Sequence, residues 1–307
     1  MAGSNLSTLM YEVCVGTTPY GCQAKEFAAA AHQPWTADGG LALGCGATYF
    51  MAVRGTNCGG LQDAVASAGA KLCCSGPASG EVAVLGDSGA EIAYATNTTA
   101  LSVQWSGFAE ACSGVRGYTI SLMDAGGSAV FSVEVNATDE LSVPLPAAVV
   151  GGLAHNQSYR ANVMATSHAG LTGDAEATFV LDRTPPEPMT VYDGAESTDL
   201  ACCSVSSRLG CSWLPVTDRT SGISQLEWAL GTTPFGTDLQ PFTALNVTST
   251  SAEVNEQLTT TPPGTITFCT LRATNRAGLQ TVAASDGATV IDDTSCDAPF
   301  ACLPSSG

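Results

Sequence analysis

Short runs of alternating apolar and polar residues recur along this chain. Residues 101–105 (Leu-Ser-Val-Gln-Trp) and 118–122 (Tyr-Thr-Ile-Ser-Leu) alternate with a period of two, which predicts half-buried β-strands. Clusters of Gly, Asn, Asp and Pro separate such runs at short intervals, and this spacing is typical of a β-sandwich rather than of βαβ units. Helical periodicity is scarce, and residues 25–32 are the stretch that best favours a short helical turn. The pattern predicts an all-β fold.

A unit of about 108 residues is repeated nearly three times along the chain. Residues 16–21 (Gly-Thr-Thr-Pro-Tyr-Gly) return as residues 231–236 (Gly-Thr-Thr-Pro-Phe-Gly). A second motif, which ends in Gly-Leu, occurs three times, at residues 48–61, 158–171 and 266–279. This periodicity predicts tandem domains of one kind.

The repeat divides the chain into four segments. We expect an incomplete β-sandwich at residues 1–75, sandwiches at 76–184 and 185–293, and a Cys/Pro-containing tail at 294–307. Alignment of the first unit on the third places Met1 just before its third strand, so its two opening strands are missing from this chain. Either a longer gene encodes those strands upstream, or another chain supplies them by strand addition. We expect residues 1–75 not to form an autonomous domain.

The charge of the chain excludes two classes of partner. It has 28 acidic and 10 basic residues and a net charge of −18. A nucleic-acid-binding protein needs a cationic surface, and an anionic membrane surface would repel this chain for the same reason. No apolar run approaches the roughly 18 residues that a membrane-spanning helix needs. We therefore expect neither nucleic-acid binding nor direct membrane insertion.

Cysteines and glycosylation sequons indicate a secreted protein. The chain has 13 cysteines, which favours disulfides in an oxidising compartment. Asn-x-Ser/Thr sequons predict N-linked glycans at Asn5, Asn97, Asn136, Asn156 and Asn246. The first residues lack the regions of a signal peptide, so we interpret the chain as a piece of a longer secreted polypeptide.

The second unit resembles a fibronectin type III domain. Leu153 precedes Tyr159 by six residues, as in that family's F strand with its tyrosine corner. Trp105 and Tyr118 resemble the family's B-strand tryptophan and C-strand tyrosine. The third unit departs from the pattern because Thr267 replaces the corner tyrosine. The resemblance implies tandem immunoglobulin-like (fibronectin type III-like) β-sandwiches.

The hairpin and linker motifs are similar to those in tandem immunoglobulin-like repeats of large extracellular proteins. Green-algal flagellar mastigoneme proteins are one such group, and the bias towards Ala, Gly and Ser fits them. This resemblance implies a non-enzymatic structural subunit of an extracellular or cell-surface fibre or matrix. Its partners would be other copies of itself or neighbouring domains of a longer polypeptide. The alternative is an adhesion or ligand-binding ectodomain of a larger membrane receptor.

Two pairs of cysteines are candidates for disulfides. In an immunoglobulin-type sandwich, Cys211 and Cys269 would lie on strands that face each other, and we expect them to pair. Two buried free thiols are the alternative. Cys14 and Cys22 flank the first Gly-Thr-Thr-Pro hairpin, so they would lie on adjacent strands and pair there.

The motifs that resemble those of enzymes do not have the spacing that a catalytic site needs. Residues 86–89 (Gly-Asp-Ser-Gly) resemble part of the chymotrypsin-like nucleophile motif, but Ser88 and His32 fall in different repeats. We interpret the motif as a turn. The other two histidines, His155 and His168, are scattered, and we expect both to be solvated. No nucleophile, base or metal cluster survives, so we expect no enzymatic activity.

Acidic residues near the linkers raise the question of interdomain Ca²⁺. Hard cations such as Ca²⁺ take six to eight oxygen ligands, and the 28 acidic residues could supply them. However, the sequence has no D-x-D-x-D-G loop, which is the usual Ca²⁺-binding motif. We favour solvated side chains over a Ca²⁺ site and expect no cofactor besides N-linked glycans. The residues concerned are Asp182, Asp193, Asp292 and Asp293.

Overall fold

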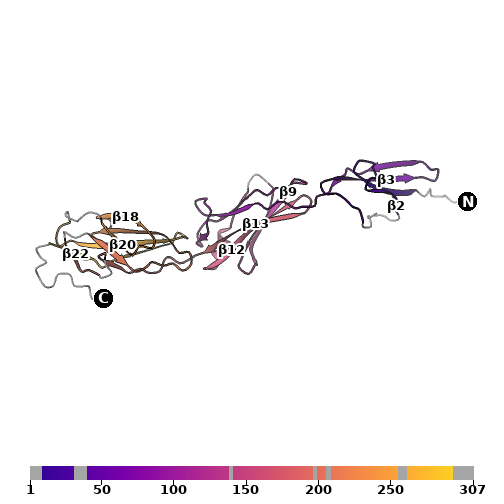
Figure 1. Ribbon diagram of the computed structural model, residues 1–307. Helices are drawn as coiled ribbons and strands as arrows, with labels where there is room; N and C mark the ends of the chain where they lie inside the picture. The colour runs from indigo at the N-terminus through magenta and orange to yellow at the C-terminus, as the bar shows by residue number, and fades with distance from the viewer. Residues whose placement is uncertain are drawn as a thin grey trace.

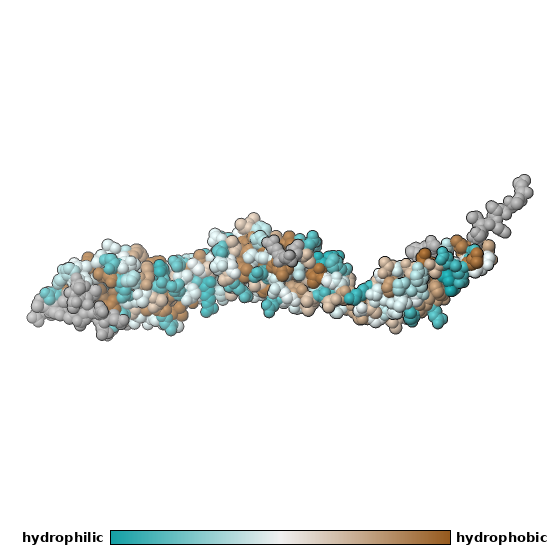
Figure 2. All heavy atoms as spheres, turned by 90° about the horizontal axis from the view of Figure 1, so that it is seen from above, coloured by the Kyte–Doolittle hydropathy of each residue, from teal (hydrophilic) through white to brown (hydrophobic). Residues whose placement is uncertain are grey.

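The computed structural model describes residues 9–30, 40–137, 141–195, 199–204, 209–254 and 261–292. Throughout this part the chain is all-β, apart from one short helix, α1 (Ala147–Gly152). The strands form three units that follow one another in a row (Figure 1). The space-filling view shows the same elongated shape, with apolar residues scattered among polar ones on the visible face (Figure 2). Among the described residues, no helix has the length and apolar character to cross a membrane.

The second unit is a two-layer sandwich. One sheet has the order β11-β8-β6 and the other β10-β9-β12-β13-β7. The first sheet consists of β6 (Glu81–Leu85), β8 (Ser102–Ser106) and β11 (Ser142–Pro144). The second consists of β7 (Tyr94–Ala95), β9 (Val115–Met123), β10 (Ala129–Asn136), β12 (Gln157–Ser167) and β13 (Thr172–Leu181). This is the strand order that a fibronectin type III-like sandwich requires.

Alternate residues of these strands form the core between the two sheets. Val103 and Trp105 on β8 face Ile120 on β9 and Val163 on β12, and all four are buried. The Trp105 and Tyr118 rings are 5.2 Å apart between centroids. Each fully buried large aliphatic side chain contributes about 1.5–3 kcal/mol to stability. The period-two pattern of the sequence is therefore the pattern of inward-facing residues.

In two units a tyrosine hydroxyl holds the turn before a long central strand, which is β3 in the first unit and β12 in the second. In the second unit the Tyr159 hydroxyl accepts a hydrogen bond from the backbone N–H of Ala154 at 2.7 Å, and this confirms the predicted corner. In the first unit Tyr49 accepts the equivalent bond from Gly44, also at 2.7 Å. Thr267 takes the position in the third unit, where its hydroxyl donates to the Ala288 carbonyl at 3.2 Å.

The third unit has the same topology as the second. Its sheets have the orders β14-β16-β19 and β15-β22-β20-β17-β18, and β21 also pairs with β20. The first sheet consists of β14 (Val191–Asp193), β16 (Gly210–Trp213) and β19 (Ser251–Glu253). The second consists of β15 (Cys202–Ser204), β17 (Ile223–Gly231), β18 (Gln240–Leu245), β20 (Ile266–Asn275), β21 (Gln280–Ala284) and β22 (Ala288–Ile291). In both units one short strand, β7 or β15, runs parallel to the last strand.

The described residues of the first unit form one sheet only. Its order is β2-β1-β3-β4, and β5 also pairs with β3. The strands are β1 (Met10–Gly16), β2 (Lys25–Ala29), β3 (Thr48–Thr56), β4 (Gln62–Ala66) and β5 (Ala70–Lys71). The expected helical turn at residues 25–32 is wrong for its first five residues, because they pair with β1 as an edge strand. Phe27 of that strand lies under the Arg54 guanidinium, 3.9 Å from the ring centroid.

Candidate functional site: the two joints

The joint between the second and third units is built around a buried carboxylate. Asp182 directly follows β13 and is completely buried. One of its oxygens accepts hydrogen bonds from Ser221 Oγ at 2.7 Å and from Asn275 Nδ2 at 3.0 Å, both in the third unit. Its other oxygen accepts from the backbone N–H of Thr184 at 3.0 Å. Hydrogen bonds to a charged acceptor are stronger than neutral ones, so Asp182 joins the two units.

Two loops of the third unit surround this carboxylate. Asn275, at the end of β20, also donates to Asp218 Oδ2 and to the Thr184 carbonyl, each at 3.0 Å. Burial alone would raise the pKa of Asp218, but hydrogen bonds from Asn275 and from the backbone of Ser221 and Gly222 leave it below its ordinary value. Asp218 therefore stays ionised and holds its loop against the linker.

The residue after Asp182 binds the opposite side of the joint. The Arg183 side chain donates to the carbonyls of Gly151 and Leu153, in the turn that contains α1. Its backbone N–H donates to His155 Nδ1 at 3.1 Å. Asp182 and Arg183, adjacent in this linker, thus contact the third and the second unit respectively.

A disulfide crosses the joint between the first and second units. Cys73, after β5, is bonded to Cys112, in the loop before β9, with a Cα–Cα distance of 5.8 Å. Its neighbour Cys74 is bonded back to Cys45 within the first unit, at 5.6 Å. The adjacent cysteines therefore connect the linker to both units. The cysteine count favoured disulfides in general but could not say which partners these two cysteines take.

Glu110 shapes the loop that carries Cys112. Its carboxylate accepts hydrogen bonds from the backbone N–H groups of Cys112, Ser113 and Gly114, at 2.5–2.9 Å. The Ser113 backbone contact makes the largest contribution to lowering the pKa of this carboxyl. Lys71 adds a hydrogen bond from its Nζ to the Cys112 carbonyl at 3.0 Å, across the joint. Cys73, Glu110 and Cys112 lie close together, yet the two sulfurs are already bonded to each other.

The structure places the two candidate cysteine pairs in disulfides. Cys211 on β16 and Cys269 on β20 face each other inside the third sandwich, with a Cα–Cα distance of 6.0 Å. Cys14 on β1 is bonded to Cys22 beyond the hairpin, at 5.2 Å. Among the described residues Cys58 is an exposed free thiol and Cys203 a buried one, and burial raises the pKa of Cys203 to about 11. The predicted tail at 294–307 lies outside the described residues.

One face of the first sheet is only partly covered, because Val13 and Val15 on this face are buried but three other apolar side chains are not. Tyr11 and Met51 on this face are each 41% exposed, and Val65 is 66% exposed. Leu226 and Cys269, at the positions equivalent to Tyr11 and Met51, are at most 2% exposed in the third unit. There the sheet β14-β16-β19 covers them, and no such second sheet is present among residues 9–30 and 40–75.

The Asp182 and Asp193 carboxyls are not solvated, contrary to expectation. Asp182 accepts the hydrogen bonds at the joint described above. Asp193, at the end of β14, is 3% exposed and accepts hydrogen bonds from Ser285 Oγ and from the backbone N–H of Gly287. Burial raises the pKa of Asp193 to about 6. Asp199 and Asp286 lie nearby, but the protein already occupies both Asp193 oxygens. Asp292 is exposed, and Asp293 lies outside the described residues.

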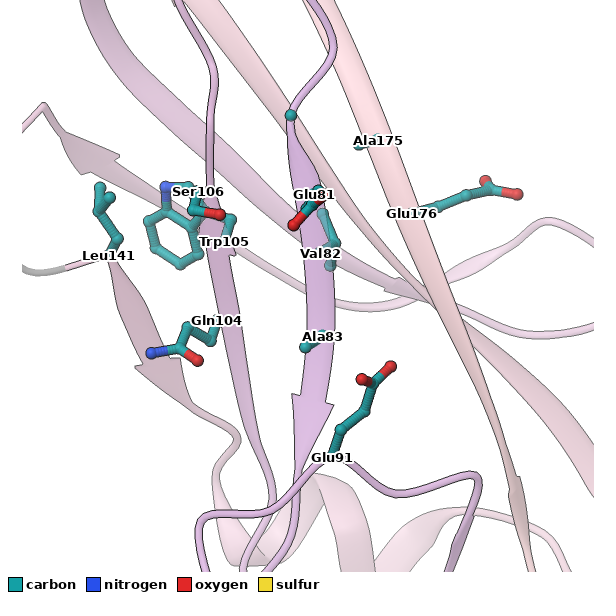
Figure 3. Close-up of a pocket in the computed structure, with 11 residues that line it drawn as sticks. Glu81, Val82, Ala83, Glu91, Gln104, Trp105, Ser106, Leu141, Ala175 and Glu176 are labelled. Carbon is teal, nitrogen blue, oxygen red and sulfur yellow. The ribbon is translucent and has the colours of Figure 1, made fainter.

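A concavity of about 810 Å³ lies on the second unit, between the edges of β6 and β13. Trp105 and Gln104 on β8 lie to one side of β6, and Glu176 on β13 lies to the other (Figure 3). Three glutamates line it, Glu176 among them, and no histidine, cysteine or lysine does.

The protease-like motif forms a turn. The backbone N–H of Gly89 donates to the Gly86 carbonyl at 2.9 Å, and the Ser88 hydroxyl accepts from the Ala90 N–H at 3.4 Å. Gly89 has φ of 73°, which explains the glycine at this position. The candidate partner His32 lies outside the described residues. His155 and His168 are both on the surface, and His155 accepts the Arg183 bond described above.

The sequence matches no protein-family model and no curated protein. Among solved structures it is similar to the FN1-FN3 domains of chicken CNTN1, with 16% identity, a TM-score of 0.37, and coverage of 94% of this chain and 90% of that one. A structure of a 1.5-MDa bacterial ice-binding adhesin has 13% identity and a TM-score of 0.40, with coverage of 94% and 88%. A two-domain fibronectin type III segment of chicken tenascin has 13% identity, a TM-score of 0.25, and coverage of 75% and 100%.

Proposed function

We propose that this chain is a non-enzymatic structural subunit of an extracellular or cell-surface fibre or matrix. The observation that carries the proposal is that bonds cross both joints. Cys73–Cys112 crosses one, and the buried Asp182 carboxylate crosses the other. Relative motion of neighbouring units is the default, and a disulfide or a buried carboxylate with hydrogen bonds from both sides opposes it. A row of sandwiches with bonded joints transmits force and keeps its spacing.

The chemistry of the cysteines supports an extracellular location. Four disulfides join described cysteines, and Cys202 is disulfide-bonded as well. Disulfides of this density persist in oxidising compartments and are rare in the cytosol. The net charge of −18 keeps such a chain soluble at high local concentration, because like-charged surfaces repel.

N-linked glycans would cover the sides of the row. Four of the five sequon asparagines are described and exposed, namely Asn97, Asn136, Asn156 and Asn246. Asn246 has the most suitable local structure, because its Oδ1 accepts from both the backbone N–H and the hydroxyl of Thr248 at 3.0 and 2.9 Å. Asn156 lies in the tyrosine corner with φ of 56°, where a glycan has less room. Asn5 lies outside the described residues.

The partners would be further copies of this chain or neighbouring domains of a longer polypeptide. The open face of the first sheet supports this, since a matching half-sandwich would bury Tyr11, Met51 and Val65. The hairpin and linker motifs resemble those of mastigoneme proteins, so a flagellar surface fibre is the first assembly to examine.

Electron microscopy of native material tests this proposal. An antibody against the second unit should label filaments at a regular spacing in negative stain, and intact-mass analysis should show mass above that of the bare polypeptide. Label confined to detergent-solubilised single particles would instead favour the ectodomain of a membrane receptor. Unglycosylated protein in the cytosolic fraction would contradict both readings.

A further inference from the structure

Two hairpin tips on different units hold an aromatic ring in the same rare backbone conformation. Tyr20 in the first unit and Phe235 in the third both have φ of 64°. Bulky residues seldom adopt this left-handed region because their Cβ crowds the backbone. The two rings are 60% and 58% exposed. The same outlier at equivalent positions of two units calls for a common cause.

The aromatic residue occupies the turn position that suits glycine. The backbone N–H of Gly21 donates to the Thr18 carbonyl at 2.9 Å, and Gly236 donates to Thr233 at 2.8 Å. Each turn therefore runs Thr-Pro-aromatic-Gly, with proline second and the aromatic residue third. A turn with positive φ at its third position takes Gly or Asn there. In both units a residue with a large side chain stands at this position instead.

Different contacts hold the two tips in the same shape. At the tip in the first unit, Gln23 Oε1 accepts a hydrogen bond from the Thr17 N–H at 3.0 Å, and the Cys14–Cys22 disulfide closes the hairpin. At the tip in the third unit, the Asp238 carboxylate accepts hydrogen bonds from the backbone N–H of Thr232 at 3.0 Å and from its hydroxyl at 2.8 Å. Bonds on both sides of the tip therefore hold each turn.

Folding does not account for these rings. A ring that stays more than half exposed buries little apolar surface, and glycine would form the same turn without crowding its Cβ. Backbone strain that recurs without a gain in packing marks a functional position. A contact with a molecule or surface outside their own unit therefore explains the rings better than folding does.

We propose that Tyr20 and Phe235 are stacking platforms for a neutral glycan. The C–H face of a sugar ring is apolar and stacks on an aromatic ring, while its hydroxyls need polar neighbours. Both tips supply this combination, because threonines precede each ring and no second large apolar residue lies beside it in the turn. A protein contact of high affinity would need a wider apolar surround. The net charge of −18 disfavours acidic sugars. This binding activity goes beyond the structural role proposed above.

The test is an array of neutral and acidic oligosaccharides, probed with the full chain and its variants. We expect binding to at least one neutral glycan. Tyr20→Gly and Phe235→Gly should each weaken binding to the immobilised glycan about tenfold or more, since two tips on one chain bind multivalently. The double variant should lose binding. Leu61→Ser and Leu214→Ser are the matched controls, because these residues are 73% and 62% exposed in the same two units. They should bind as the parent does.

Thermal unfolding separates binding from folding. Because glycine relieves the crowded backbone, neither glycine variant should have a lower Tm than the parent chain. A lower Tm would show that the rings are structural and would overturn the proposal. The absence of neutral-glycan binding by the parent, or equal binding by the double variant, would overturn it as well. Loss of self-association in the double variant, with no sugar bound by the parent, would assign the rings to a protein contact instead.

Discussion

Asp182 and Asn275 lie 93 residues apart in the sequence, in different units, and share a buried hydrogen bond of 3.0 Å. The same amide nitrogen reaches Asp218 and the Thr184 carbonyl. A buried carboxylate without hydrogen-bond partners costs folding free energy, so the loss of any one group in this network would destabilise the others. A buried hydrogen-bond network therefore spans both units at this joint.

Asn275→Ala should loosen this joint. The substitution leaves the Asp182 carboxylate with one fewer donor, which costs about 1–3 kcal/mol of unfolding free energy in urea. Asn57→Ala is the matched control. Asn57 makes the same two turn bonds through its Oδ1 as Asn275 does, to Gly59 and Leu61 at 2.9 and 3.0 Å. The difference between the two variants measures the contacts of the Asn275 amide nitrogen with Asp182, Asp218 and the Thr184 carbonyl. Equal losses would mean that the Asp182 contact contributes nothing.

Removing the disulfide that crosses the first joint should free the first unit. In the loop-entropy model, closing the 39-residue span between Cys73 and Cys112 contributes about 4 kcal/mol. We expect Cys73→Ser/Cys112→Ser to broaden the distance distribution between spin labels on the first and second units. Labels on the second and third units should keep a narrow distribution. A narrow distribution at the first joint would show that Glu110 and Lys71 hold it unaided.

Asp193 should make the third unit less stable as pH rises from about 4 to about 6. Burial raises its folded pKa to about 6 from an ordinary value of 3.8, so the folded state binds the proton more tightly than the unfolded state in this window. The stabilisation is complete below pH 4 and lost above pH 6, and the difference amounts to about 3 kcal/mol. The ¹³C shift of the Asp193 carboxyl should titrate near pH 6. A midpoint below 4 would contradict this account.

Residues 1–75 should exchange their amide protons faster than residues 78–182 when each is expressed alone. The first sheet exposes Met51 and Val65 on the face that a second sheet covers elsewhere, so its unfolding needs little free energy. Protection equal to that of the second unit would show that the first unit is complete without further strands.

The sequence predicted the sandwich because its inward-facing positions carry the signal. Val103, Trp105 and Ile120 alternate with polar neighbours, and the same residues are buried in the core. The tyrosine corner followed from the resemblance of the Leu153 and Tyr159 spacing to the fibronectin type III family, and its hydrogen bond joins residues only five apart. Features of this kind depend on residues close together in the chain.

The joints could not be predicted because their contacts are distant in sequence. Cys73 and Cys74 are adjacent but pair in opposite directions, and spacing alone allows many connectivities. Asp182 looked like a solvated linker residue, because nothing near it in the chain indicates that Ser221 and Asn275 would enclose it. The strand at residues 25–29 was missed since pairing with β1, rather than its own periodicity, makes it extended.

Small-angle X-ray scattering from the full chain tests the central claim most directly, which is that bonded joints make this chain a stiff row of sandwiches. The account predicts that one elongated arrangement of the three units fits the data (Figure 1). It also predicts that the Cys73→Ser/Cys112→Ser variant can be fitted only by an ensemble bent at the first joint. Scattering from the parent chain that requires the same broad ensemble as the variant would contradict it.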